Sequence, residues 1–354
     1  MTRRLMVMAG GTGGHVFPAM AVADFLLQKG WSVTWLATEG GMENRLIANK
    51  PYQVAMIRMS GVRGKGLLRK ITAPFQVLKA CWQSYRAMRQ HRPDVVLGMG
   101  GFAAFPGGLV ARLLRLPLVI HEQNSVAGLT NRLLAKITRH VLAAFPSALG
   151  DRAQVTGNPV RSDISGISDP AQRLTYRKGP LRILVVGGSL GAQALNDAVP
   201  KALALMAPEK RPQVIHQAGA QHIETLQANY QKAGLSAETR AFIEVMAAMY
   251  DWCDLVICRA GALTVAELAA AGVASILVPF PHAVDDHQTG NARYLSYQNA
   301  AVLLPQQDIS PEKLAALIDG MDREKLLGMA SRAKALGKPD ATAEVAALCE
   351  EIAR

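Results

Sequence analysis

Short apolar runs recur along the chain, and segments with helical periodicity separate them. Most runs lead into glycine or polar residues, which is where a chain leaves a strand. Runs without polar alternation are typical of strands buried in a parallel sheet. With their exits, they cover residues 4–9, 31–37, 94–101, 118–124, 182–191, 214–217, 242–243, 255–258 and 275–278. Their alternation with helical segments predicts an α/β fold with doubly wound parallel sheets.

The opening of the chain is repeated in its second half. Residues 182–191, RILVVGGSLG, echo residues 4–13, RLMVMAGGTG, after a shift of 178 positions. Arginine, valine and two glycines coincide in the two segments. Two units of strand, glycine loop and helix, one at the start of each half, predict two facing Rossmann-like domains.

A segment rich in Gly, Pro, Ser and Asp covers residues 156–170 and is the expected interdomain connection. It divides the chain into an N-terminal domain, residues 1–160, and a C-terminal domain, residues 161–340. The amphipathic segment 341–354 is expected to form a helix that packs back across the domains.

The net charge of +12 is concentrated in the first half of the chain. Residues 1–150 hold 19 Lys and Arg against 5 Asp and Glu, whereas residues 151–354 hold 20 against 22. Only the basic half is therefore expected to meet a polyanion. An anionic membrane surface is favoured over nucleic acid, because aromatic residues are few and no nucleic-acid-binding motif is found.

Other broad classes are excluded by composition. No apolar run is long enough to span a bilayer, and glycines interrupt the N-terminal apolar run too early for a signal peptide. The four cysteines have no metal-ligand spacing, which favours buried free thiols in a reducing cytosol. They are Cys81, Cys253, Cys258 and Cys349.

One predicted helix carries more apolar surface than a single core contact needs. Its first apolar face contains Ile71, Phe75, Leu78, Trp82 and Tyr85, and its second contains Val77, Cys81 and Met88. The basic residues around them are Arg63, Lys65, Arg69, Lys70, Lys79, Arg86 and Arg89. An apolar surface with basic flanks suits anionic lipid, so we predict that the first face binds a membrane. The alternative is that this stripe is simply core.

The stretch 254–288 holds the strongest candidate for ligand binding. A buried strand leads through Arg259 and Gly261 into a helix with free N-terminal amides, which suit a diphosphate. One turn in, Glu267 could accept hydrogen bonds from the hydroxyls of a ribose. The polar residues 285–288 follow the next strand and should reach the same rim of the sheet. Alternatively, Thr264 and Glu267 form only a capping box, and residues 285–288 a solvated turn.

The glycine loop GGTGGH, residues 10–15, ends in a candidate general base. His15 lies at the mouth of this loop, although a histidine that merely caps a helix start is the alternative. The spacing Gly11-x-Gly13 lacks the third glycine of a dinucleotide-binding fingerprint. Glu39 follows the next strand, where a dehydrogenase would place its ribose-binding acid, and this keeps a nicotinamide-dependent function open.

The strand predicted at residues 118–124 carries three polar residues at its exit. His121, Glu122 and Asn124 lie at a carboxyl end, where polar residues seldom serve packing. We expect this exit to line the acceptor side, with Glu122 as the reserve candidate for the base.

Eight motifs, in order over almost the whole chain, resemble those of the MurG family of bacterial glycosyltransferases. They are GGTGGH (10–15), SGVRGKG (60–66), VVLGMGGF (95–102), HEQN (121–124), GNPVR (157–161), VVGGSLGA (185–192), CRAGALTVAELAAAG (258–272) and DDHQTGNA (285–292). The resemblance implies a two-domain GT-B fold. It also implies inverting transfer of N-acetylglucosamine from its UDP conjugate to undecaprenyl-diphospho-N-acetylmuramoyl-pentapeptide. This reaction belongs to peptidoglycan synthesis and takes place on the cytoplasmic face of the inner membrane, where the enzyme is peripheral.

The resemblance further implies which residues contact the UDP-sugar. They are Thr12, Gly13, Gly14, Asn124, Arg161, Ser189, Ile243, Ala262, Leu263, Thr264, Val265, Ala266, Glu267 and Gln288. Leu190 departs from the family, which often has Gln there, so a side-chain contact from this position is not expected. The chain has no Asp-x-Asp, and therefore neither a metal nor another cofactor is expected.

Three other functions compete with this interpretation. A nicotinamide-dependent oxidoreductase would use Gly11, Gly13 and Glu39, but it leaves the second glycine loop unexplained. A non-catalytic lipid-binding adaptor would use the basic half alone. A nucleotide-sugar epimerase of similar fold would bind the same donor and need no lipid acceptor.

Overall fold

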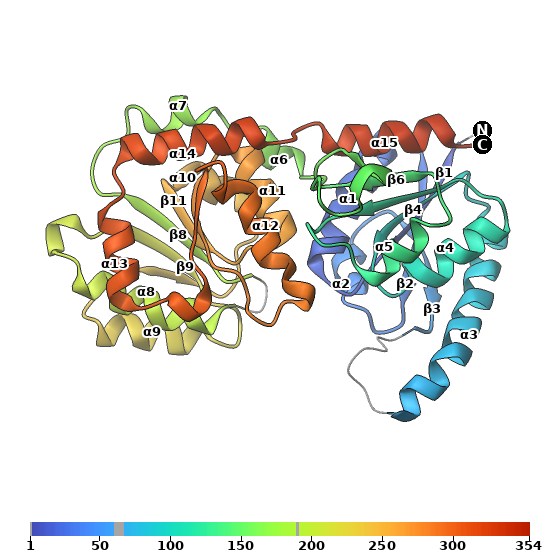
Figure 1. The fold of residues 1–354 in the computed structure, drawn as a ribbon, viewed down its shortest axis with the longest axis horizontal. Coiled ribbons are helices and arrows are strands. Elements are labelled where there is room, and N and C mark those ends of the chain that lie inside the picture. The colour runs from blue at the N-terminus through green and yellow to red at the C-terminus, as the bar shows by residue number, and fades with distance from the viewer. Residues whose placement is uncertain (1, 60–66, 189–190) are drawn as a thin grey trace. The chain divides into compact units, whose positions relative to one another are not determined.

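The computed structural model describes residues 2–59, 67–188 and 191–354, and for residues 67–72 the backbone alone. Two compact units form, one from Met1–Arg161 with Pro339–Arg354 and the other from Ser162–Lys338 (Figure 1). Within these described ranges, no helix is long and apolar enough to cross a membrane. The motif at residues 60–66, with Arg63 and Lys65, lies outside them.

The first unit is a seven-stranded sheet with the order β3-β2-β1-β4-β5-β6-β7, and its paired strands are parallel. The strands are β1 (Arg4–Ala9), β2 (Ser32–Thr38), β3 (Gln53–Ile57), β4 (Val95–Gly100), β5 (Leu118–Glu122), β6 (His140–Ala143) and β7 (Gln154–Val155). The helices are α1 (Gly13–Gln28), α2 (Glu43–Ile47), α3 (Leu67–His91), α4 (Ala104–Leu113), α5 (Leu129–Leu134) and α15 (Ala341–Ile352). The four strands predicted in this half are confirmed.

The second unit is a six-stranded parallel sheet with the order β10-β9-β8-β11-β12-β13. Its strands are β8 (Arg182–Val186), β9 (Gln213–Gln217), β10 (Glu238–Arg240), β11 (Leu255–Cys258), β12 (Ala274–Leu277) and β13 (Ala301–Leu303). Its helices are α6 (Ser162–Ser165), α7 (Pro170–Leu174), α8 (Gln193–Leu205), α9 (Ile223–Lys232), α10 (Met246–Trp252), α11 (Ala262–Ala271), α12 (His287–Ser296), α13 (Pro311–Asp319) and α14 (Arg323–Leu336). The strand end predicted at residues 242–243 is wrong, because β10 stops at Arg240.

The repeat in the sequence corresponds to a repeat in topology. In each unit the first strand lies at the centre, and the chain moves first to one side of it and then to the other. The direction of winding reverses between β1 and β4 in the first unit and between β8 and β11 in the second. Ligands of open α/β sheets bind beyond the carboxyl ends of strands at such points. The prediction of two doubly wound parallel sheets is confirmed.

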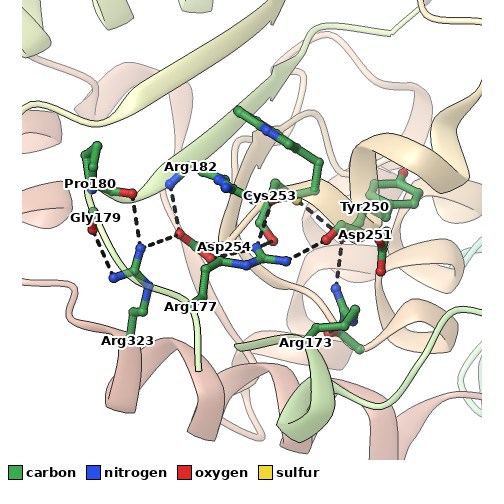
Figure 2. Close-up of polar contacts among 12 residues, drawn as sticks. Arg173, Arg177, Gly179, Pro180, Arg182, Tyr250, Asp251, Cys253, Asp254 and Arg323 are labelled. Atoms are coloured by element: carbon green, nitrogen blue, oxygen red, sulfur yellow. Dashed lines mark hydrogen bonds and ion pairs between the residues drawn. The ribbon is translucent and has the colours of Figure 1, made fainter. Parts of the chain in front are cut away.

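Each unit fixes the amino end of its central strands with an aspartate. Asp94, just before β4, accepts hydrogen bonds from the backbone N–H of Arg4 at 2.8 Å and from its guanidinium at 3.2 Å. Asp254, just before β11, accepts from the backbone N–H of Arg182 at 2.9 Å and from the Arg177 guanidinium at 2.8 Å (Figure 2). These contacts lie at the edge opposite to the carboxyl ends, so they serve the fold.

The two apolar faces of α3 lie in different surroundings. Ala80, Ala87 and Met88 pack in the core under α3, and Cys81 is partly buried beside them. On the other face, Phe75 is 73% exposed and Trp82 is 57% exposed. Leu78 and Tyr85 are exposed beside them, whereas the side chain of Ile71 lies outside the described part. The alternative that the first face is core is therefore wrong for the four residues described.

Candidate active site

The β1–α1 and β4–α4 loops meet at the carboxyl edge of the first sheet. Gly100 and Gly101 have positive φ angles of 96° and 88°. A Cβ on Gly101 would collide with the carbonyl group of Gly10, and one on Gly100 would lie 3.0 Å from the imidazole of His15. Glycine is therefore required at both positions. At Gly101 it allows the contact between the loops, and at Gly100 it leaves space for the imidazole of His15.

His15 is held by a residue from the neighbouring loop. Its Nδ1 lies 2.7 Å from Oε1 of Gln123, a side chain with no solvent exposure. The amide nitrogen of Gln123 lies 3.0 Å from the carbonyl oxygen of His121 and 3.2 Å from Nδ1 of the His121 ring. The other ring nitrogen of His121 bonds to the carbonyl of Gly157 at 2.8 Å. Burial lowers the pKa of His121 to about 4, so the ring is neutral at physiological pH.

Glu122 organises the loop that follows β5. Its buried carboxylate accepts hydrogen bonds from the backbone N–H of Asn124 at 2.9 Å, from that of Gly128 at 3.1 Å and from the side-chain amide of Asn131 at 2.9 Å. Protein donors already occupy both oxygens of this carboxylate, which leaves little room for the proton of a substrate. The geometry therefore favours His15 over Glu122 as the proton acceptor, and both assignments stay predictions.

A second buried carboxylate lies beneath the first glycine loop. Glu43 has no solvent exposure and accepts hydrogen bonds from the backbone and hydroxyl of Thr38, at 2.9 and 2.6 Å, and from the backbone N–H of Gly11 at 3.3 Å. A dinucleotide site needs such an N–H for its diphosphate. Glu39, the acid expected for the oxidoreductase alternative, instead pairs with Arg58 at 2.8 Å on the surface. This arrangement argues against that alternative.

The predicted diphosphate site of the second unit begins with a glycine. Gly261 is the N-cap of α11, and among the described residues no side chain caps this helix end. Thr264 is the third residue of the helix, so the alternative of a capping box formed by Thr264 and Glu267 is wrong. Val265 has no exposure, and any ligand contact from it would come through the backbone. The first-turn amides of α11 remain suited to an anion.

Glu267 is a buried carboxylate of the second unit, with 7% of the residue exposed. Its Oε2 accepts a hydrogen bond from the hydroxyl group of Tyr250 at 3.0 Å. Burial, together with the charge of Glu267, raises the pKa of Tyr250 well above its ordinary value. Tyr250 therefore stays a hydrogen-bond donor and holds the carboxylate on the side of α11.

The exit of β12 gathers the other residues predicted for this rim. The Arg259 guanidinium donates to the carbonyls of Val278 and Pro279 at 3.3 and 3.2 Å. Gln288 accepts from the backbone N–H of Phe280 at 2.9 Å. Arg259 and Gln288 thus bind the same short segment, which confirms the predicted common rim. Arg259 acts there by positioning the backbone.

The remaining predicted contacts are placed as follows. Thr12 is the extended N-cap of α1, Gly13 and Gly14 are its first two residues, and Ile243 is 4% exposed three residues after β10. Ala262 is buried, while Leu263, Ala266, Asn124 and Arg161 are partly exposed. Ser189 and Leu190 lie outside the described residues. These positions stay predictions.

Three contributors were missed by sequence reasoning. Gln123 is part of the HEQN motif and could have been considered there, but its partner His15 is 108 positions away. Glu43 and Tyr250 occur in ordinary helical contexts, and nothing in their sequence neighbourhood signals a buried partner. All three act on other residues of the site.

Two family models match the chain in order. The glycosyltransferase family 28 N-terminal domain matches residues 5–143, and the C-terminal domain of the same family matches residues 182–345.

Curated relatives cover the whole chain. A protein of Dechloromonas aromatica is 54% identical over 100% of both chains. One of Burkholderia pseudomallei is 56% identical over 99% of this chain and 96% of its own. Both are called UDP-N-acetylglucosamine–N-acetylmuramyl-(pentapeptide) pyrophosphoryl-undecaprenol N-acetylglucosamine transferase.

Solved structures agree with these relatives. MurG of Acinetobacter baumannii superposes with a TM-score of 0.86 at 45% identity, over 99% of each chain. A UDP-GlcNAc 2-epimerase of Neisseria meningitidis, in a structure with UDP-GlcNAc bound, has a TM-score of 0.63 at 13% identity. That match covers 98% of this chain and 100% of the other. At this identity, the epimerase shares the fold alone.

Proposed function

The chain belongs to glycosyltransferase family 28, and from this premise we propose that it transfers N-acetylglucosamine from UDP-N-acetylglucosamine to an undecaprenyl-diphospho-N-acetylmuramoyl-pentapeptide. The observation that carries this is identity of 54% and 56% to transferases named for this reaction, over essentially the full length of both chains. The donor and the acceptor are assigned below to different units, so a match to one unit alone would not suffice.

We assign the donor to the second unit. The diphosphate would bind the uncapped first-turn amides of α11 behind Gly261, with the glycine loop after β8 as the second contact. Glu267 would accept hydrogen bonds from the ribose hydroxyls, and Gln288 would contact the sugar. No step requires a metal, because backbone amides and the helix dipole can stabilise the charge that develops on UDP.

We assign the acceptor to the carboxyl edge of the first unit. His15 would take the proton of the 4-hydroxyl of the muramoyl sugar as that oxygen attacks the anomeric carbon. The new glycosidic C–O bond forms while the bond from C1 to the UDP oxygen breaks, which inverts the configuration. The electron pair leaves with UDP, and the proton remains on the imidazole.

We also propose that the first unit binds the cytoplasmic face of the inner membrane through α3. Its exposed residues Phe75, Leu78 and Trp82 would enter the lipid interface, and Lys79 and Arg86 would contact anionic headgroups. Arg86 also lies 4.9 Å from the centre of the Trp82 ring. The helix reaches past the strands at its N-terminal end (Figure 1).

The direct test uses radiolabelled UDP-N-acetylglucosamine and a lipid-linked muramoyl-pentapeptide acceptor. Label is expected in the lipid extract, in amounts that depend on acceptor. An epimerase would instead convert the donor without acceptor, and an oxidoreductase would be stabilised by NAD in a thermal-shift assay. Label that stays in the water-soluble fraction, with both substrates bound, would contradict the proposal.

Replacing Glu267 with glutamine is expected to weaken UDP-sugar binding about 10- to 100-fold, because hydrogen bonds to a charged acceptor are lost. Isothermal titration with UDP-N-acetylglucosamine measures this. Tyr250→Phe is a companion variant with a smaller expected loss, since it keeps the carboxylate and removes only the hydroxyl that holds it. Unchanged affinity in Glu267→Gln would limit Glu267 to a structural role.

Replacing Phe75 and Trp82 together with serine is expected to weaken vesicle binding at least about tenfold. Each of these side chains, once buried in the lipid interface, would contribute about 1.5–3 kcal/mol to the free energy of binding. Co-sedimentation with phosphatidylglycerol-containing vesicles measures the loss. Tyr297, 73% exposed in the second unit, gives the matched control Tyr297→Ser, which should bind normally. Equal losses in both variants would exclude α3 as the membrane surface.

A further inference from the structure

A chain of four groups ends at the predicted base. It runs from the Gly157 carbonyl through the His121 ring and the Gln123 amide to the His15 ring. From these contacts we infer that Gln123 is a positioning residue, which fixes the tautomer of His15 with the proton on Nδ1 and the lone pair on Nε2. This inference rests on the proposed function only in so far as His15 is the base.

The orientation of the Gln123 amide follows from a carbonyl group. The amide atom that lies 3.0 Å from the carbonyl oxygen of His121 has to be a donor, because that oxygen can only accept. It is therefore the nitrogen, Nε2. The opposite atom, Oε1, must then face His15, where it can only accept. Buried amides with both ends bonded are held in this orientation.

The tautomer of His121 supports the same orientation. Its Nε2 lies 2.8 Å from the carbonyl oxygen of Gly157 and must carry the proton of the neutral ring. Its Nδ1 is consequently an acceptor, and it receives the second N–H of Gln123 at 3.2 Å. With His121 and Gln123 both without solvent exposure, water does not compete for these bonds.

These contacts determine which ring nitrogen of His15 carries the proton. Its Nδ1 lies 2.7 Å from an atom that cannot donate, so Nδ1 carries the proton. The neutral ring then keeps its lone pair on Nε2, which is the form that can accept a proton. The glycine at position 100 leaves room for the ring in this orientation, because a Cβ there would lie 3.0 Å from Nδ1 and Cε1 of His15.

The test combines nitrogen NMR of histidine-labelled protein with kinetics. In the unmodified protein, the His15 signals, assigned by their absence in His15→Ala, should show a protonated Nδ1 and an unprotonated Nε2. Gln123→Met keeps the length of the side chain but removes the amide. It should shift His15 toward the other tautomer and lower kcat about tenfold or more, with the KM for UDP-N-acetylglucosamine unchanged. Gln123→Glu retains the acceptor that faces His15 but loses the donor to His121, so it should keep the His15 tautomer and recover only part of kcat.

A second His–Gln pair in the same unit is the matched control. Nδ1 of His91 lies 2.9 Å from Oε1 of Gln53 at an exposed position. Gln53→Met should leave both the His15 spectrum and kcat unchanged. A proton on Nε2 of His15 in the unmodified protein, or an unchanged spectrum in Gln123→Met, would overturn the inference. Because the spectra are recorded without substrate, they test this inference separately from the assignment of His15 as base, which fails if His15→Ala remains active, and from the transferase function, which the labelling experiment tests.

Discussion

Replacing His15 with alanine is expected to lower turnover about 100- to 10,000-fold, the usual contribution of a general base. The side chain is partly exposed at the carboxyl edge of the first sheet, and one ring nitrogen is occupied by Gln123. Removing it leaves no group with a lone pair at that position. Single-turnover measurements with the lipid-linked acceptor report the loss.

The affinity for UDP-N-acetylglucosamine is the internal control for this variant, because the donor is assigned mainly to the second unit and His15 is not among the residues predicted to contact it. It should remain unchanged in His15→Ala. A loss of less than tenfold in a folded variant would exclude His15 as the base and return attention to Glu122. Glu122→Gln is expected to act differently, since it places an amide where Asn124, Gly128 and Asn131 now donate. That variant should lose thermal stability along with activity.

Most strands near the centre of each sheet follow from local patterns, which is why they could be predicted. Runs such as Leu255–Cys258 are apolar on both faces, and a repeated glycine loop marks the start of each unit. Short edge strands could not be predicted in this way. β7 (Gln154–Val155) has only two residues, both exposed, and its strand character comes from pairing with β6.

The helix α3 shows where periodicity stops being informative. Two apolar faces were visible in the sequence, but periodicity alone does not say which face is buried. The structure buries the side of Ala80 and Met88 and leaves Phe75 and Trp82 exposed. Both faces carry large apolar residues at helical spacing, and Met88 on the buried face is as large as Leu78 on the exposed one, so the sequence pattern could not separate them.

The sequence predicted which residues belong to the candidate site, but not the hydrogen bonds between them. With Thr264 as the N-cap, Thr264 and Glu267 would form a capping box. The N-cap is instead Gly261, three residues earlier. Helix ends are hard to place from sequence to within one or two residues. The bond between His15 and Gln123 joins positions 108 residues apart. Such contacts depend on the register of β1 against β4 and of β4 against β5, which the sequence does not state.

Replacing Asp254 with alanine is expected to destabilise the second unit by about 3–5 kcal/mol, as for other buried ion pairs that lose one partner. The side chain of Asp254 has no exposure, and that of Arg177 is 12% exposed. The variant would leave Arg177, Arg323 and the backbone N–H of Arg182 without their common acceptor (Figure 2). Arg177 would keep its bonds to backbone carbonyls, which places the loss toward the lower end of this range.

Asp94 provides the matched control in the first unit, because it binds Arg4 as Asp254 binds Arg182. There the ion pair is partly solvated, with 43% of the Arg4 side chain and 17% of the Asp94 side chain exposed. Asp94→Ala is therefore expected to cost about 1 kcal/mol, mainly for the lost backbone hydrogen bond.

Hydrogen exchange of peptides from β8 and β11, compared with β1 and β4, reports each unit separately, since a two-unit chain need not unfold in one step. Equal losses in the two variants would mean that burial of the ion pair does not determine its contribution. A larger loss confined to β8 and β11 would show that the more deeply buried aspartate stabilises its unit more strongly than the partly solvated one does.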